Sequence, residues 1–367
     1  MATASSMTMS PSVPPLSSNE SSPTTSFDIV KYYNELLQAD SQITPPIAAI
    51  ESLISLLATT PLTTISETLA LLSTHSTKLL SSQQNPIPLF AGTDLFQRYL
   101  VSSFQQRPSS LATSDFTALR HQIITNSSLF VKRANEARNK IAHQAAQFIR
   151  DDSTVITYGY SRVVHTLLTH AAEAGRYFNV LYVLPASGLS QTIQDSISEL
   201  KKLSVPTTTI PIHALHFALA SLPASSPPPQ LVTGASAVLE NGSIITQFGT
   251  HQIALTAKSV SIPLYVAAES YKFVRKFPLG CGQSDLAQLG VKQDVLRFET
   301  ADSDTEAEGR ESGKREPKSA KTASQPCITN IDDMVEITPP DLISALFTET
   351  GIMTPDAVSE ELIKLWF

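Results

Sequence analysis

The 367-residue sequence predicts an α/β protein in which an N-terminal all-helical domain precedes a parallel sheet with flanking helices. Residues 27–150 carry apolar side chains at helical spacing and almost no strand pattern. From residue 151 onward, short apolar runs alternate with helical segments of about a dozen residues, which is the pattern of βαβ units in a parallel sheet. We therefore expect a helical domain over 27–150 and a sheet domain over 151–367.

Four amphipathic helices are expected first. Their apolar stripes begin at Phe27, Ile47, Ile65 and Leu95. The second follows Pro45 and Pro46, which suit a first helical turn. Residues 116–151 can hold one or two more helices, and their last section is expected to turn Ala137 and Ile141 inward and Arg138 outward.

The second domain is expected to hold five buried strands separated by helices. We place these strands at 154–157, 180–184, 207–210, 231–233 and 264–268. A turn is expected at Asn241-Gly242, because both residues tolerate positive φ. Toward the end of the chain, a helix is expected to carry Leu342, Ile343 and Leu346. A last helix should start at Thr354-Pro355 and end in an apolar terminus that packs on the sheet or on a subunit interface.

Two segments are expected to be disordered. Residues 1–26 are mostly Ser, Thr and Pro, and residues 299–322 form an acidic insertion with few apolar side chains. A plain loop is the favoured interpretation of the insertion, and an acidic partner-binding tail is the alternative.

The composition argues against several classes of protein. A net charge of −7 without a Lys/Arg cluster argues against direct nucleic-acid binding. No apolar run reaches the roughly 20 residues of a membrane span, and residues 1–26 lack the basic residues of a targeting signal. Two cysteines are too few for a disulfide framework, and we expect His165 and His170 to be structural rather than metal ligands. A cytosolic protein without membrane contact is therefore expected.

The carboxyl edge of the sheet is the expected ligand site. After the first strand, Tyr160, Ser161 and Arg162 offer backbone N–H groups, a hydroxyl and a cation, which suit a phosphate at a helix N-terminus. In the alternative interpretation, Ser161 only caps the helix and Arg162 faces solvent.

Five further residues are expected at the same crevice. They are Gly234, Gly249, Thr250, Glu269 and Lys272. Lys272 could add a second positive charge, and Glu269 could orient it or a ligand hydroxyl, with a plain salt bridge as the alternative. The chain has no GxGxxG or GxxxxGK[ST] motif, and neither Cys281 nor Cys327 lies at a strand end. The crevice therefore suits a phosphorylated small molecule, and no catalytic residue or metal site is predicted.

Several motifs carry a family resemblance. They read SLFVKRANEARNKIA at 128–142, TVITYGYSRVV at 154–164, GASAVLENGSIITQFGTHQIALTAKS at 234–259, PLYVAAESYKFVRKFPL at 263–279 and SEELIKLWF at 359–367. In this order they closely resemble the alpha-subunit branch of the eukaryotic translation initiation factor 2B family. The wider superfamily includes sugar-phosphate isomerases related to methylthioribose-1-phosphate isomerase, and it implies a Rossmann-like domain.

The resemblance implies a non-catalytic regulatory subunit of the guanine-nucleotide exchange factor for initiation factor 2. Such subunits form homodimers and join beta and delta subunits in a decamer that also holds gamma and epsilon. They help to sense the phosphorylated alpha subunit of initiation factor 2, which lowers exchange under stress. The helix pair around 44–57 and the loops that join these helices are our candidate surface. Because Lys31 and Lys78 are the only basic residues between 27 and 80, we expect recognition by shape more than by an Arg clamp.

The related isomerases act through a cysteine in the first strand-to-helix turn and an aspartate in a Gly-Ala-Asp motif. This chain has Gly159 and its neighbours at the first position and Ser236 at the second. Lys272 matches the phosphate-site lysine of the isomerases, so a bound sugar phosphate or nucleotide remains an expectation. Thr246-Gln247 replaces the Asn-Lys pair of many relatives, which weakens that expectation. A sugar-phosphate isomerase or a metabolite sensor is the alternative function.

Overall fold

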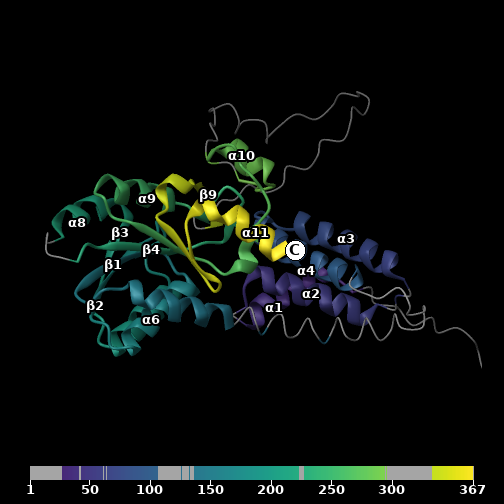
Figure 1. The fold of residues 1–367 in the computed structure, drawn as a ribbon, viewed down its shortest axis with the longest axis horizontal. Helices are drawn as coiled ribbons and strands as arrows, with labels where there is room; N and C mark the ends of the chain where they lie inside the picture. Colours follow the sequence, from purple (N-terminus) through teal and green to yellow (C-terminus); the bar gives the residue numbers. More distant parts are fainter. Residues whose placement is uncertain are drawn as a thin grey trace, which may run out of the picture.

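The computed structural model describes residues 27–40, 43–60, 62, 64–105, 125, 132, 136–222, 227–293, 295 and 333–366. The first four helices gather at one end of the molecule, and the main sheet lies at the other (Figure 1). The predicted tail at 1–26 and the acidic insertion at 299–322 lie outside the described residues. No helix in the described part is both long enough and apolar enough to cross a membrane.

The four expected N-terminal helices are confirmed. They are α1 (Ile29–Ala39), α2 (Pro45–Thr59), α3 (Ile65–Ser81) and α4 (Ile87–Gln105). The side chains of Asp28 and Thr64 cap α1 and α3 by accepting backbone N–H bonds, and α2 begins with prolines. The apolar stripes meet in a core of their own, which includes Ile50, Leu53 and Leu100.

The main sheet has seven strands. They are β1 (Ser153–Tyr158), β2 (Phe178–Leu184), β3 (Thr207–Pro211), β4 (Gln230–Gly234), β7 (Leu264–Ala267), β10 (Ala345–Thr348) and β11 (Gly351–Met353). Their order across the sheet is β11-β10-β7-β4-β1-β2-β3, and only β11 runs antiparallel to its neighbour. All five predicted strands belong to this sheet, so the predicted Rossmann-like α/β class is confirmed.

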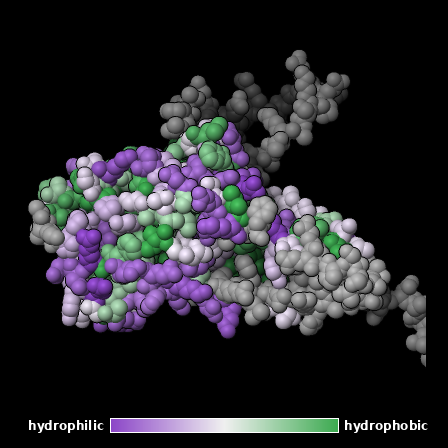
Figure 2. All heavy atoms as spheres, in the orientation of Figure 1, coloured by the Kyte–Doolittle hydropathy of each residue, from purple (hydrophilic) through white to green (hydrophobic). Residues whose placement is uncertain are grey.

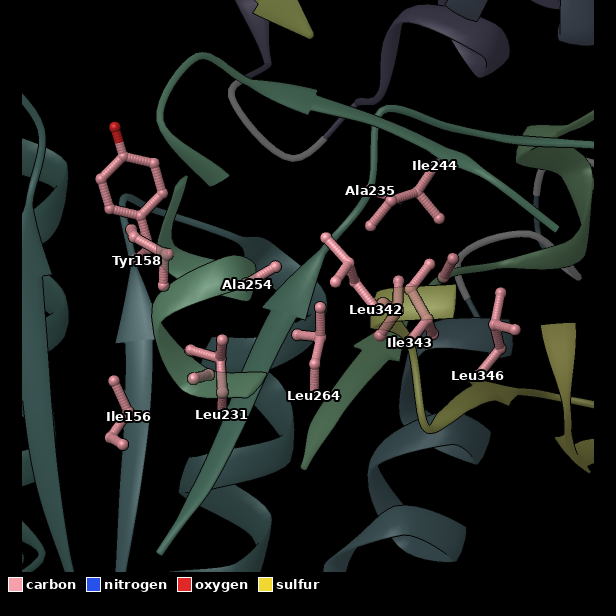
Figure 3. Close-up of a cluster of buried hydrophobic side chains, with 14 of the residues drawn as sticks. Ile156, Tyr158, Leu231, Ala235, Ile244, Ala254, Leu264, Leu342, Ile343 and Leu346 are labelled. Atoms are coloured by element: carbon pink, nitrogen blue, oxygen red, sulfur yellow. The ribbon is translucent and has the colours of Figure 1, made fainter. Parts of the chain in front are cut away.

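Helices cover both faces of the sheet. The core on one face holds residues of α6 (Arg162–Glu173), of α7 (Gln191–Lys202) and of the segment 137–149. The core on the other face holds residues of α8 (Leu215–Ser221), α9 (Thr250–Ser259) and α11 (Val358–Trp366). Figure 3 shows this second core, where Ile156, Leu231, Leu264 and Leu346 come from four adjacent strands. The segment 137–149 precedes the predicted domain boundary at residue 150 but packs with the sheet. The boundary itself stays a prediction.

A second sheet was not predicted. It contains β5 (Ala237–Leu239), β6 (Ile244–Gln247), β8 (Phe273–Val274) and β9 (Val335–Thr338), in the order β8-β5-β6-β9, and α10 (Gln283–Gln288) packs beside it. The predicted turn at Asn241-Gly242 joins β5 to β6, and Gly242 has φ +80°. Strands of two to four residues are too short for their alternation to stand out in the sequence. This sheet packs on α4 through Ile87 and Ala91.

The helix predicted around Leu342–Leu346 is wrong. A short 3-10 helix covers Pro340–Leu342, and the chain then enters β10. The spacing of Leu342, Ile343 and Leu346 allows either structure over so short a run. Pairing with β7, in which Leu346 lies opposite Val266, decides for the strand. The last helix is confirmed as α11.

Candidate functional site

A cavity opens beside β1, at the point in the sheet where the strands that follow β1 in the chain switch from one side of it to the other. The chain adds β2 and β3 on one side of β1 and then crosses over to place β4 on the other side. Ligands of open parallel sheets bind at such switch points, outside the carboxyl ends of the strands. Here a cavity of about 510 Å³ is lined by the turns after β1 and β4 and, from the helical half, by Thr44, Pro45 and Pro46.

The structure brings most of the predicted site residues together in this cavity. Seven of the eight line it: Tyr160, Ser161, Arg162, Gly234, Thr250, Glu269 and Lys272. Gly249 is not among the lining residues. Whether the cavity holds a ligand stays a prediction.

Ser161 and Arg162 do not match the alternative interpretation, in which Ser161 only caps the helix and Arg162 faces solvent. Ser161 occupies the N-cap position of α6, but its side chain makes no capping hydrogen bond. A Cβ added at Gly234 would collide with Oγ of Ser161, so the turns after β1 and β4 approach each other closely. Arg162 does not face solvent: it is half-buried, and its Nη1 donates to the carbonyl oxygen of Ile43 at 2.8 Å. Burial, and then the nearby Arg138, lower the pKa of Arg162.

A buried carboxylate organises one wall of the cavity. Glu269, only 1% exposed, lies with Oε2 2.7 Å from Nζ of Lys272. Its Oε1 accepts a hydrogen bond from the Tyr271 hydroxyl at 3.1 Å and lies 3.6 Å from Nε of Arg138. Burial alone would raise the pKa of Glu269, but Lys272 and Arg138 outweigh it and lower that pKa. The ion pair between Glu269 and Lys272 fits both the orienting role and the plain salt bridge, so the orienting role stays a prediction.

Arg138 is the residue that the sequence placed wrongly. It was expected on the outer face of its helix, yet it is 9% exposed and faces Glu269. Arg138 lies four residues before the buried Ala142, and residues so spaced share one helix face. That spacing was a signal in the sequence that Arg138 belongs to the inner side.

The N-terminus of α9 is occupied by a carboxylate of the chain itself. Gly249, with φ +104°, forms the N-cap, and the N–H of His251 donates to Oε1 of Glu336 at 2.6 Å. Burial raises the pKa of Glu336 although backbone N–H groups of α9 oppose that shift. The Thr250 hydroxyl donates to the carbonyl oxygen of Gln247 at 2.8 Å. Sequence reasoning missed Glu336, because β9 joins this site only through the second sheet.

The site has the chemistry of an anion-binding cavity. Two cationic side chains, Arg162 and Lys272, and one carboxylate, Glu269, line the cavity, and Arg138 lies against Glu269 from outside the lining. Among the described lining residues, none is Asp, Cys or His. The arrangement can therefore hold an anion through charge and backbone N–H groups.

The histidines singled out in the sequence make local hydrogen bonds. His165 lies between Ser196 Oγ at 2.8 Å and Glu199 Oε2 at 3.0 Å, and His170 lies 3.3 Å from His143. Within the described ranges, no group of three or more His, Cys, Asp or Glu side chains could hold a metal ion.

The chain is similar to known proteins over most of its length. It is 30% identical over 340 residues to the Dictyostelium discoideum protein named translation initiation factor eIF2B subunit alpha. The aligned residues cover 92% of this chain and 96% of that protein. It is 25% identical over 265 residues to the ribose 1,5-bisphosphate isomerase of Pyrococcus furiosus, covering 72% of each.

A solved structure shares the fold. A chain of the tetrameric eIF2B-beta2-delta2 complex from C. thermophilum matches with a TM-score of 0.67 at 16% identity, covering 92% of this chain and 93% of that one. The model of the initiation factor 2 subunit family matches residues 38–355. With a family match over most of its length and a near-full-length relative at 30% identity, this chain belongs to the initiation factor 2 subunit family.

Proposed function

We propose that this chain is the alpha, regulatory subunit of the guanine-nucleotide exchange factor for translation initiation factor 2. The observation that carries the proposal is the similarity to a protein named as that alpha subunit, which extends over 96% of the relative's length. The chain forms a homodimer and bridges beta and delta subunits within the larger complex. It works in the cytosol.

Assembly is the first test. The purified chain is mixed with beta and delta subunits, and the masses of the resulting particles are measured in solution. We expect a dimer of this chain alone and a larger particle that contains all three subunits. A chain that stays apart from beta and delta at micromolar concentration would contradict the proposal.

The proposal includes the sensing of phosphorylated initiation factor 2 by the helical half. Exposed Lys31 and Lys78 each pair with an acid, at 3.8 Å from Glu35 and 3.0 Å from Asp28. This pairing supports recognition by shape rather than by a dedicated cationic clamp. Charge-reversing substitutions on exposed positions of α1 and α2, followed by pull-down with phosphorylated and unphosphorylated partner, test this. Unchanged discrimination in every variant would count against the surface.

The cavity supports a bound sugar phosphate or nucleotide as a regulatory ligand. Calorimetry with a small panel of sugar phosphates and nucleotides tests this, first on the wild type and then on Lys272→Ala. We expect at least tenfold weaker binding in Lys272→Ala, because one of the charges that would face the phosphate is removed. Lys258→Ala is the matched control, since Lys258 pairs with Asp341 on the exposed surface. No heat with any member of the panel would remove the ligand from the proposal.

An isomerase is the second candidate function, because a ribose 1,5-bisphosphate isomerase is among the relatives. The residues support a non-catalytic chain: Gly159 and Tyr160 follow β1 and Ser236 follows β4, at the positions where the family resemblance implies the cysteine and aspartate of the isomerases. An isomerase assay on the purified chain separates the two functions. Turnover of a phosphorylated pentose would favour the enzyme.

A further inference from the structure

A second cavity, of about 440 Å³, lies at the amino ends of three adjacent strands. Its lining includes Ser153 at the start of β1, Gln230 at the start of β4 and Tyr265 in β7, and these strands lie in the order β7-β4-β1. The first cavity lies at the carboxyl ends of the same strands and borders the helical half. The second therefore lies at the end of the sheet away from the four N-terminal helices (Figure 1). We call it the amino-edge cavity.

Two aromatic rings line the amino-edge cavity. Phe148 and Tyr265 lie edge to face, with their ring centroids 6.3 Å apart. The buried ring of Phe347 packs against both, at 5.2 Å from Phe148 and 5.1 Å from Tyr265. Because Phe148 is 36% exposed, part of its ring is open to a planar ligand. Rings that are held in place before a ligand arrives lower the entropic cost of binding.

The polar groups of the amino-edge cavity are hydrogen-bond donors. Arg150 lines it, and within the described residues its guanidinium forms no ion pair, while the neighbouring Asp151 pairs with Arg176. Gln230 is 7% exposed, and its Nε2 is buried without a hydrogen-bond partner in the part of the chain that the structure describes. An unpaired buried N–H costs free energy, which an acceptor would recover. The last torsion of a glutamine side chain is soft, so Nε2 can be presented to an acceptor in the cavity.

The charge of the lining indicates the kind of ligand. Among the described residues that line the amino-edge cavity, none is Asp or Glu. The cavity therefore has donors for a carboxylate, which a guanidinium binds through two parallel hydrogen bonds, and no partner for an ammonium group. Its volume is that of a small-molecule site. Figure 2 shows a mosaic of hydrophilic and apolar areas over the half of the molecule that holds the main sheet, so a compact ligand with both characters fits better than a broad apolar partner.

We propose that the amino-edge cavity binds an aromatic carboxylate that carries no amino group. The ring of the ligand packs on Phe148 and Tyr265, and its carboxylate accepts hydrogen bonds from Arg150 and from Nε2 of Gln230. An aromatic amino acid is a poorer ligand, because its ammonium group would lose water without gaining an acidic partner. This site goes beyond the proposed function and does not depend on a ligand in the first cavity.

Calorimetry on the purified full chain tests the site with 3-phenylpropionate and two matched compounds. The first, 3-phenylpropanamide, has the same ring and chain but no charge. The second, phenylalanine, adds an ammonium group to 3-phenylpropionate. We expect each of the two to bind the wild type at least tenfold more weakly than 3-phenylpropionate does.

Variants assign the binding to named side chains. Arg150→Met should bind 3-phenylpropionate at least tenfold more weakly than the wild type, and its preference for the acid over the amide should disappear. Gln230→Leu should bind the acid about fivefold more weakly, because one neutral hydrogen bond is lost. Arg275→Met is the control, since Arg275 is exposed and lies outside the lining, and it should stay within twofold of the wild type. Unchanged melting temperatures show that each variant is folded.

Lys272→Ala separates the two cavities, because Lys272 lines the first one and not the second. We expect this variant to bind 3-phenylpropionate within twofold of the wild type. Binding that is weakened by Lys272→Ala and not by Arg150→Met would assign the carboxylate to the first cavity and overturn the proposal. No heat with 3-phenylpropionate at millimolar concentration, or equal binding of the acid and the amide by the wild type, would overturn it as well.

Discussion

The guanidinium of Arg162 donates a hydrogen bond to the carbonyl oxygen of Ile43 at 2.8 Å, which joins the first turn of α6 to the residues before α2. A second link lies beside it, where the hydroxyl of Thr44 donates to the hydroxyl of Tyr271 at 3.4 Å. Tyr271 in turn donates to the buried Glu269. The cavity wall and the start of α2 are therefore one hydrogen-bonded unit.

Replacing Arg162 by Met should loosen this unit. The variant keeps much of the side-chain volume but removes a charge-assisted hydrogen bond, so we expect a loss of about 1.5–3 kcal/mol in the free energy of unfolding. Hydrogen exchange should become faster for the first amides of α2, beginning with Ala48, whose N–H donates to Thr44. Arg176→Met is the control, because Arg176 forms an exposed pair with Asp151 at 3.5 Å. Equal protection of α2 in both variants would contradict the link.

Replacing Glu269 by Gln should give a stability loss that depends on pH. The pKa of Glu269 is lowered from 4.5 in the folded protein, so folding favours the ionised carboxylate. Its contribution is complete above pH 4.5 and disappears as the pH falls through the lower folded value. We expect the variant to be about 3 kcal/mol less stable than the wild type at pH 7, because two buried cations lose their partner.

Denaturant unfolding of both proteins across pH 3–7 measures this effect, and the difference between them should narrow below about pH 4.5. Glu35→Gln is the control, since its exposed pair with Lys31 should contribute less than about 1 kcal/mol. A difference between wild type and Glu269→Gln that stays constant across this range would show that the carboxylate is not held ionised.

Substitution of Gly249 should be more damaging than that of another glycine with positive φ. Gly249 has φ +104°, and an added Cβ would lie 2.7 Å from the Tyr158 hydroxyl oxygen. Gly175 has φ +80°, but a Cβ there would meet no atom within 4 Å. We expect Gly175→Ala to cost about 1 kcal/mol and Gly249→Ala at least about 3 kcal/mol in the free energy of unfolding. Equal losses in the free energy of unfolding would mean that the collision with Tyr158 adds nothing and that backbone strain alone destabilises both variants.

Replacing Phe347 by Ala tests the strand that the sequence did not predict. Phe347 is 2% exposed in β10, and its ring stacks on Tyr265 with the centroids 5.1 Å apart. The loss of such a ring should cost about 3–5 kcal/mol. Ile363→Ala, at a site 58% exposed on α11, should cost less than about 1 kcal/mol. Thermal unfolding measures both, and similar losses would argue against a buried β10.

Seven of the eight candidate residues could be placed at one cavity from the sequence because each follows an apolar strand or starts a helix. In a parallel sheet, the ends of such strands meet at one edge, so strand order alone brings Arg162, Gly234 and Lys272 together. The partners of these residues were harder to find. Arg138 comes from a helix outside the sheet, and Glu336 comes from a strand that follows the acidic insertion.

The sequence by itself determined the helical N-terminal half, the five central strands and the cavity edge, because these depend on periodicity within short windows of the chain. Only the tertiary structure decided that residues 345–348 form a strand and that four short segments form a second sheet. It also decided that the buried Glu269 binds Arg138 and Lys272. These features depend on pairing between residues far apart in the chain, where the free energy comes from long-range hydrogen bonds and burial rather than from local preference.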